Sequence, residues 1–93
     1  MVDRAYRAAP PGALRIESMG ELTAIFDRRS MQTHLVVAPM PEILDAMGTD
    51  ICDAASLAAR LSAIFDFDSE EDARPLLNER LGELAAMGLV ARA

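Results

Sequence analysis

Residues 21–37 read Glu-Leu-Thr-Ala-Ile-Phe-Asp, then Arg-Arg-Ser-Met, then Gln-Thr-His-Leu-Val-Val. Two runs rich in apolar and β-branched residues, separated by a short polar break, are typical of a β-hairpin. The second run alternates, so Leu35 falls on one face of its strand and Val36 on the other. Everything after Ala38 reads as helix, so the last strand is expected to be an exposed edge. An exposed edge beside helices can bind an extended peptide.

One more strand precedes the hairpin. Residues 13–18 alternate apolar and polar side chains, as a half-buried strand does. Gly20 can adopt the positive φ that a tight turn needs. Strands 13–18, 21–27 and 32–37 are therefore expected to form a three-stranded antiparallel meander with the second strand in the centre.

The first twelve residues contain Pro10-Pro11-Gly12, which can continue neither a helix nor a central strand. Residues 1–12 are therefore predicted to be a flexible N-terminal arm, and residues 13–93 a single domain. The sequence leaves open whether Tyr6 fixes the arm to that domain.

Three helices are expected after the sheet. Pro41 suits the first turn of a helix, and Gly48 ends that helix after about two turns. A loop over residues 49–52 follows. Asp53 is a good N-cap for the second helix, because its carboxylate can accept from free backbone amides. Ser69 is the predicted N-cap of the third helix.

The third helix contains a proline. In a helix capped at Ser69, Pro75 removes one backbone hydrogen bond near the end of the second turn. The sequence leaves two alternatives, a helix that tolerates Pro75 and a helix recapped at Asp72. The predicted core stripe of this helix is Ala73, Leu77, Leu81 and Leu84, with Leu76, Arg80 and Met87 along one flank.

The predicted fold class is α+β and winged-helix-like, a three-stranded antiparallel meander followed by three helices. The 93 residues suit one domain, and the hydrophobic share of 52% can supply its core. No apolar run approaches the roughly 20 residues of a membrane span, and the N-terminus has no apolar segment of the signal-peptide kind. One cysteine excludes an internal disulfide and fits a reducing cytoplasm.

Several short stretches of the sequence, in their order and spacing, resemble those of a known family. They are Arg7-Ala-Ala-Pro-Pro-Gly-Ala-Leu, Thr33-His-Leu35, Glu42-Ile-Leu44, Ser56-Leu-Ala-Ala-Arg-Leu61 and Leu84-Ala-Ala-Met-Gly-Leu-Val90. Together they are similar to the PqqD family of peptide chaperones, and within it to the branch of the HPr-related-A system. The similarity covers nearly the whole chain from Tyr6 onward. One departure is Val37-Ala38 after the Thr-His-Leu strand, where the family tends to have Asn-Pro.

The resemblance implies a non-catalytic protein without a cofactor, which binds the leader of a ribosomally made precursor peptide and presents it to modifying enzymes. The leader is expected to add to the third strand in a groove closed by the third helix. Carried onto this sequence, the groove has Gln32, Thr33, His34, Leu35, Val36 and Val37 on one wall, and Leu76, Arg80, Glu83 and Met87 on the other. The branch also implies an HPr-kinase-like partner. The sequence leaves open whether the edge is free or pairs with a second copy in a homodimer.

Two other function classes fit the sequence less well. A winged-helix nucleic-acid-binding regulator would place the third helix in the major groove. The formal net charge of −6 and the absence of a basic cluster beyond Arg28-Arg29 weigh against it. A small acidic carrier protein fits the charge, but it does not fit the alternating strands of the first 37 residues.

Isolated reactive side chains point to no catalysis or metal binding. His34 is the only histidine and has no other ligand at metal-site spacing, and Cys52 has neither a second cysteine nor a histidine nearby. Arg80 is interpreted as a contact for an acidic leader residue or as an intrahelical partner of Glu83. Leu35→Asp and Leu81→Asp are expected to unfold the domain. Val36→Pro is expected to spare the fold and abolish leader binding.

Overall fold

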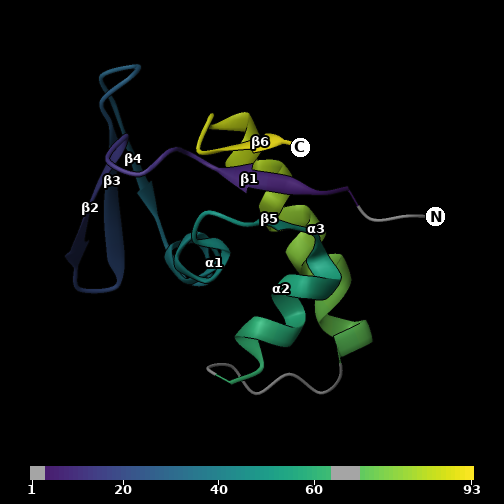
Figure 1. Cartoon of the computed structure of the whole chain (residues 1–93). Helices are drawn as coiled ribbons and strands as arrows, with labels where there is room; N and C mark the ends of the chain where they lie inside the picture. Colours follow the sequence, from purple (N-terminus) through teal and green to yellow (C-terminus); the bar gives the residue numbers. More distant parts are fainter. Residues whose placement is uncertain (1–3, 64–69) are drawn as a thin grey trace.

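The structure is a computed structural model that describes residues 4–63 and 70–93 (Figure 1). An antiparallel sheet contains β2 (Leu14–Met19), β3 (Leu22–Asp27) and β4 (Gln32–Val36), with β3 in the centre. In the described part of the chain, three helices follow: α1 (Met40–Met47), α2 (Ala54–Leu61) and α3 (Glu70–Ala86). The predicted α+β arrangement, a three-stranded meander followed by three helices, is confirmed.

A second, smaller sheet was not predicted. Its strands are β1 (Tyr6–Ala8), β5 (Ile51–Cys52) and β6 (Val90–Arg92), in the order β5-β1-β6. The prediction that residues 1–12 form a separate arm is therefore wrong for β1, which is the central strand of this sheet. The loop expected over residues 49–52 likewise contains β5. Strands of two or three residues are too short to show alternation, so no periodic pattern predicts them.

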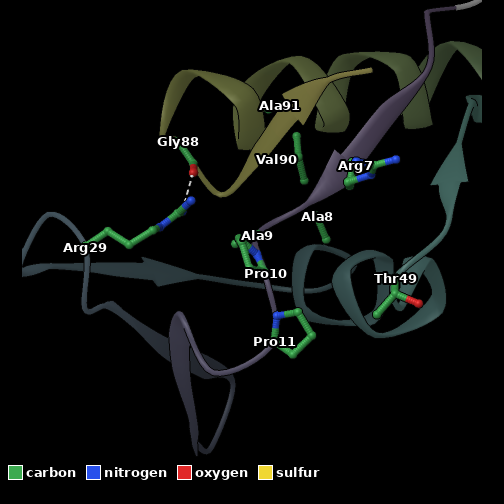
Figure 2. Close-up of a pocket in the computed structure, with 10 residues that line it drawn as sticks. All are labelled: Arg7, Ala8, Ala9, Pro10, Pro11, Arg29, Thr49, Gly88, Val90 and Ala91. Carbon is green, nitrogen blue, oxygen red and sulfur yellow. Dashed lines mark hydrogen bonds between the residues drawn. The ribbon is translucent and has the colours of Figure 1, made fainter.

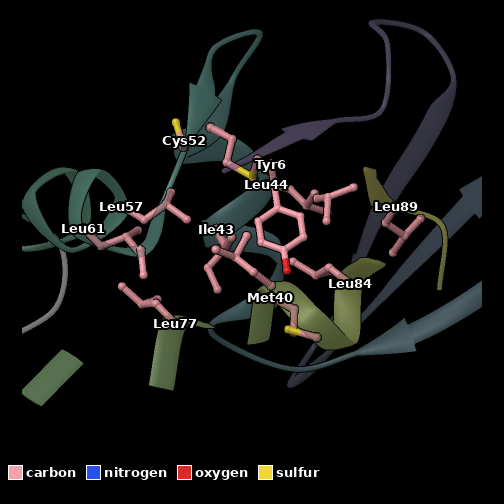
Figure 3. Close-up of a cluster of buried hydrophobic side chains, with 14 of the residues drawn as sticks. Tyr6, Met40, Ile43, Leu44, Cys52, Leu57, Leu61, Leu77, Leu84 and Leu89 are labelled. Carbon is pink, nitrogen blue, oxygen red and sulfur yellow. The ribbon is translucent and has the colours of Figure 1, made fainter. Parts of the chain in front are cut away.

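One hydrophobic core connects both sheets and the helices. Tyr6 enters this core from β1 and is 5% exposed, so it fixes the N-terminal segment to the rest of the domain. Figure 3 shows its ring among the buried side chains of the helices. The large, fully buried side chains are Ile25, Ile43, Met47, Cys52, Leu57, Leu61, Leu77, Leu81, Leu84 and Leu89. The predicted core stripe of α3 is thus confirmed.

The two faces of the β2-β3-β4 sheet have opposite roles. The pairs Ile25↔His34 and Thr23↔Val36 share the inner face, on which Ile25 and Val36 are buried. Leu35 lies on the outer face and is 62% exposed, so the prediction that it belongs to the core is wrong. Alternation separates the two faces of a strand, but it does not say which face the helices cover.

Local signals at the helix ends agree with the structure where it describes them. The Asp53 carboxylate accepts a hydrogen bond from the Ser56 amide at 2.8 Å, which confirms the predicted N-cap of α2. The helix α3 runs through the exposed Pro75, so it tolerates the proline and is not recapped at Asp72. The predicted Ser69 cap lies outside the described residues. None of the described helices is long and apolar enough to cross a membrane.

An ion pair between a buried carboxylate and an exposed arginine fixes the tip of the hairpin. Asp27 is 3% exposed, and the Arg29 Nε and Nη2 atoms each donate to one of its carboxylate oxygens at 3.0 Å. Arg29 Nη2 also donates to the carbonyl of Gly88 at 3.0 Å, as Figure 2 shows. The pair therefore ties the β3–β4 turn to the turn that follows α3. The hydrogen bond from Arg29 lowers the pKa of Asp27 below its usual value of 3.8, although burial acts in the opposite direction.

Acid is expected to weaken this corner of the fold. Because the pKa of Asp27 is lower in the folded state, its contribution is present above about pH 4 and is lost as the pH falls through the lowered pKa. Urea unfolding between about pH 5 and pH 2 should show a steeper loss of stability for the natural chain than for Asp27→Asn. Glu21→Gln, at an exposed carboxylate, should keep the natural slope. Equal slopes for the natural chain and Asp27→Asn would contradict this expectation.

Candidate functional site

The strand β4 is an edge of its sheet. It pairs with β3 on one side only, and no described strand pairs with its other side. The N-terminal segment does not fill this place, because β1 lies between β5 and β6 in the other sheet. The unpaired edge of β4 is therefore available to an added strand.

One hydrogen bond fixes the direction of each backbone group in the hairpin. Arg28 donates its N–H to the carbonyl of Ala13 at 2.9 Å, and Ala13 directly precedes β2. Successive N–H groups along a strand point to opposite sides. The N–H and C=O groups of Asp27 therefore point away from β2 and toward β4, and so do those of Ile25 and Thr23.

The pairing register carries this direction over to β4. His34 faces Ile25 and Val36 faces Thr23, so these two residues use their N–H and C=O groups in the ladder with β3. The alternate residues, Thr33 and Leu35, direct their backbone groups to the open side. The free edge thus consists of the N–H and C=O groups of Thr33 and Leu35.

This arrangement overturns the expected behaviour of Val36→Pro. Proline has no N–H, and at position 36 it would remove a hydrogen bond of the β3–β4 ladder. The Val36 side chain is also buried in the core. The substitution is therefore expected to damage the fold, and Leu35 is the residue whose replacement by proline affects only the open side.

A groove of about 480 Å³ lies between the end of β4 and α3. Its lining residues are Leu35, Val36, Val37, Ala38, Pro39, Met40, Leu76, Arg80, Glu83 and Met87. Seven of the ten predicted site residues line it, and the two predicted walls face each other. The apolar part includes the exposed Leu76 and the half-buried Met87 from α3. Sequence reasoning missed Ala38, Pro39 and Met40, because it assigned them to the connection that ends the sheet.

The other three predicted residues lie elsewhere on β4. Gln32 is exposed beside the hairpin turn. Thr33 lies on the outer face, where it lines a shallow hollow of about 270 Å³ with residues of β2 and β3. His34 is half-buried on the inner face, and its buried Nε2 atom has no hydrogen-bond partner among the described residues. Their side chains do not line the groove, although Thr33 still supplies backbone groups to the free edge.

The charged residues at the rim of the groove belong to one intrahelical cluster. Arg80 Nη1 lies 2.7 Å from one Glu83 carboxylate oxygen and 2.9 Å from the other, and Arg80 Nη2 lies 3.3 Å from Glu79. The interpretation of Arg80 as an intrahelical partner of Glu83 therefore agrees with the structure. An acidic residue of a peptide bound in the groove would have to compete with two carboxylates for this guanidinium, so Arg80 is not a vacant anion site.

A second hollow, of about 430 Å³, lies between β1, β6 and the hairpin tip (Figure 2). Its wall consists mainly of small side chains, including Ala8, Ala9 and Ala91. Of its two arginines, Arg29 is already bonded to Asp27 and Gly88. Sequence reasoning could not find this hollow, because it depends on the pairing of β1 with β6.

Other reactive side chains are isolated. Among the described residues, no three His, Cys, Asp or Glu side chains gather closely enough to hold a metal ion. Cys52 is buried, and burial raises the pKa of its thiol, which disfavours the reactive thiolate. The groove beside the free edge is therefore the strongest candidate site.

Comparisons of the chain with protein-family models, with curated proteins and with solved structures give no match. The similarity to the PqqD family stays a prediction from the sequence. Support for a function comes from the geometry of the free edge and the groove.

Proposed function

We propose that this chain is a non-catalytic peptide chaperone of the PqqD type, which binds the leader of a ribosomally made precursor peptide. The leader adds as a strand to β4, and the chain presents it to modifying enzymes in the cytoplasm, including an HPr-kinase-like partner. The observation that supports this proposal is the position of the free backbone groups of Thr33 and Leu35 beside the groove under α3.

The edge and the groove make different contributions to binding. An antiparallel guest exchanges backbone hydrogen bonds with Thr33 and with Leu35, each worth about 0.5–1.5 kcal/mol net, whatever the guest sequence. Apolar guest side chains that bury themselves against Leu76 and Met87 add up to roughly 1.5–3 kcal/mol each. Ordering the guest consumes part of this gain, so a few well-placed anchors determine the affinity.

The charge of α3 supports peptide binding over nucleic-acid binding. The helix that would enter a major groove exposes Glu79 and Glu83 more than Arg80, with side-chain exposures of 65%, 43% and 27%. Phosphates are repelled by such a surface. A duplex would also make no use of the free edge of β4.

Amide hydrogen exchange tests the proposal residue by residue. In the free chain, the amides of His34 and Val36 should be protected by the ladder, and those of Thr33 and Leu35 should exchange rapidly. Adding a cognate precursor peptide should slow exchange at Thr33 and Leu35. Binding that protects α3 while leaving both edge amides in rapid exchange would count against strand addition.

A further inference from the structure

The apolar surface beside the free edge continues past the groove onto the outer face of the sheet. Leu35 is 62% exposed and Val37 is 52% exposed, and both also line the groove. Beside them on the outer face lie Ala24, the register partner of Leu35, and the exposed Leu22, two residues before Ala24 on the same strand. The groove and the outer face therefore form one continuous apolar surface around the edge of β4.

An added strand places its side chains on both faces of the sheet. Successive side chains of a strand point to opposite faces, so a guest on β4 directs every second side chain to the outer face. On the outer face, these guest side chains lie directly beside Leu35 and Val37 and extend the apolar rows that contain Ala24 and Leu22. The remaining side chains point to the inner face, toward the groove and Leu76.

We propose that the guest is apolar on both faces, with at least three consecutive apolar residues opposite residues 35–37. This inference rests on the proposed function and specifies the chemical class of the guest. A guest with apolar residues only at alternate positions fills the groove but sets polar side chains beside Leu35 and Val37. Side chains that face each other across neighbouring strands stabilise a sheet when both are apolar. A guest with a continuous apolar run is therefore expected to bind more tightly than one with apolar residues at alternate positions.

A guest strand accounts for the exposed apolar residues better than a second copy packed on the outer face. Leu35 and Val37 belong both to the groove and to the outer face, so one occupant of the edge touches both. The other end of the outer face carries Arg15 and Glu17 beside Thr33, around the shallow hollow. The apolar part of the face, which also includes Met19 on β2, lies at the end of the sheet where Leu35 and Val37 border the edge.

Selection from a random peptide library tests the guest class. Ten-residue peptides are selected on the immobilised full chain, and binders retained by a Leu35→Pro chain, which lacks one edge amide, are discarded. Three or more consecutive apolar residues in the remaining peptides support the inference. Apolar residues at alternate positions overturn it and leave the proposed function standing. If no edge-dependent binder is found, the proposed function fails, and the inference with it.

Three matched variants show which face the selected peptide touches. Leu35→Thr should weaken binding by about two- to fivefold through the outer face, and Leu76→Gln should weaken it through the groove. Met19→Thr, at an exposed apolar residue on β2 that is separated from β4 by β3, should leave the affinity unchanged. Unchanged affinity for Leu35→Thr overturns the inference. So does a free chain that is dimeric by light scattering and becomes monomeric on Leu22→Thr, because a second copy then covers the outer face.

Discussion

Leu81→Asp is expected to leave the chain unfolded at neutral pH, whereas Leu35→Asp is expected to leave it folded. Leu81 is completely buried in the middle of α3. Removing its side chain costs about 2–5 kcal/mol, and an unpaired carboxylate in the same place costs several more. A domain of this size has roughly 5–14 kcal/mol of stability, so this one change removes most or all of it.

The matched change at position 35 separates burial from residue type. Position 35 is also a leucine, but it lies on the exposed face of an edge strand, where substitutions usually change stability by about 0.5 kcal/mol or less. Far-UV circular dichroism and urea unfolding of the two variants provide the measurement. Unfolding of Leu35→Asp would show that the outer face is covered by something that the fold requires. A cooperative transition retained by Leu81→Asp would contradict the placement of α3.

The parts of the fold that were predictable are those with a local signal. Asp53 is read as an N-cap because a carboxylate at that position serves its own helix, three residues away. The stripe through Leu77 and Leu81 repeats at helical spacing and needs no knowledge of the rest of the chain. The hairpin around residues 28–31 is a contact between neighbours in sequence. In each case the interaction is short-range, so the sequence contains both partners together.

The parts that were missed depend on contacts between distant segments. Tyr6 becomes part of a central strand only because Cys52 and Arg92, from the middle and the end of the chain, pair on either side of it. The burial of Val36 in place of Leu35 depends on the side from which the helices approach the sheet. The edge direction of Leu35 depends on the register with β3, which a periodic pattern does not give.

The candidate site was predictable to the extent that it combines a strand edge with a helix flank. Leu76, Arg80 and Met87 were placed together by helical spacing alone, and the groove brings them opposite Leu35 and Val37. The sequence could not show that Arg80 is held by two carboxylates at once, because its exposure and the distances decide that. The sequence also could not show which backbone groups of residues 32–37 are vacant, because alternate residues of β4 face β3.

Leu35→Pro is expected to abolish binding of a guest strand while the chain keeps its fold. The N–H of Leu35 points to the open side of β4, so its loss removes no bond of the ladder with β3. Proline is tolerated on edge strands when its missing N–H faces solvent. A guest loses one hydrogen bond, leaves one of its own carbonyls unpaired and meets the proline ring. These losses together amount to about 3 kcal/mol, or roughly a hundredfold in affinity.

Two neighbouring substitutions make this result specific to the backbone. Leu35→Ala removes the same side chain and keeps the N–H, so it should weaken binding by about tenfold or less. Val36→Pro removes a ladder hydrogen bond and a buried side chain, so it should lower the melting temperature as well. Calorimetric titration and thermal unfolding of each variant distinguish the three cases, with a peptide that was selected on the natural chain without discarding the binders that Leu35→Pro retains. If Leu35→Pro and Leu35→Ala bind equally well, only the side chain matters and the guest does not pair with the edge of β4. If Leu35→Pro unfolds the chain as readily as Val36→Pro, the backbone directions assigned to β4 are wrong, because only a residue whose N–H faces β3 contributes to the ladder.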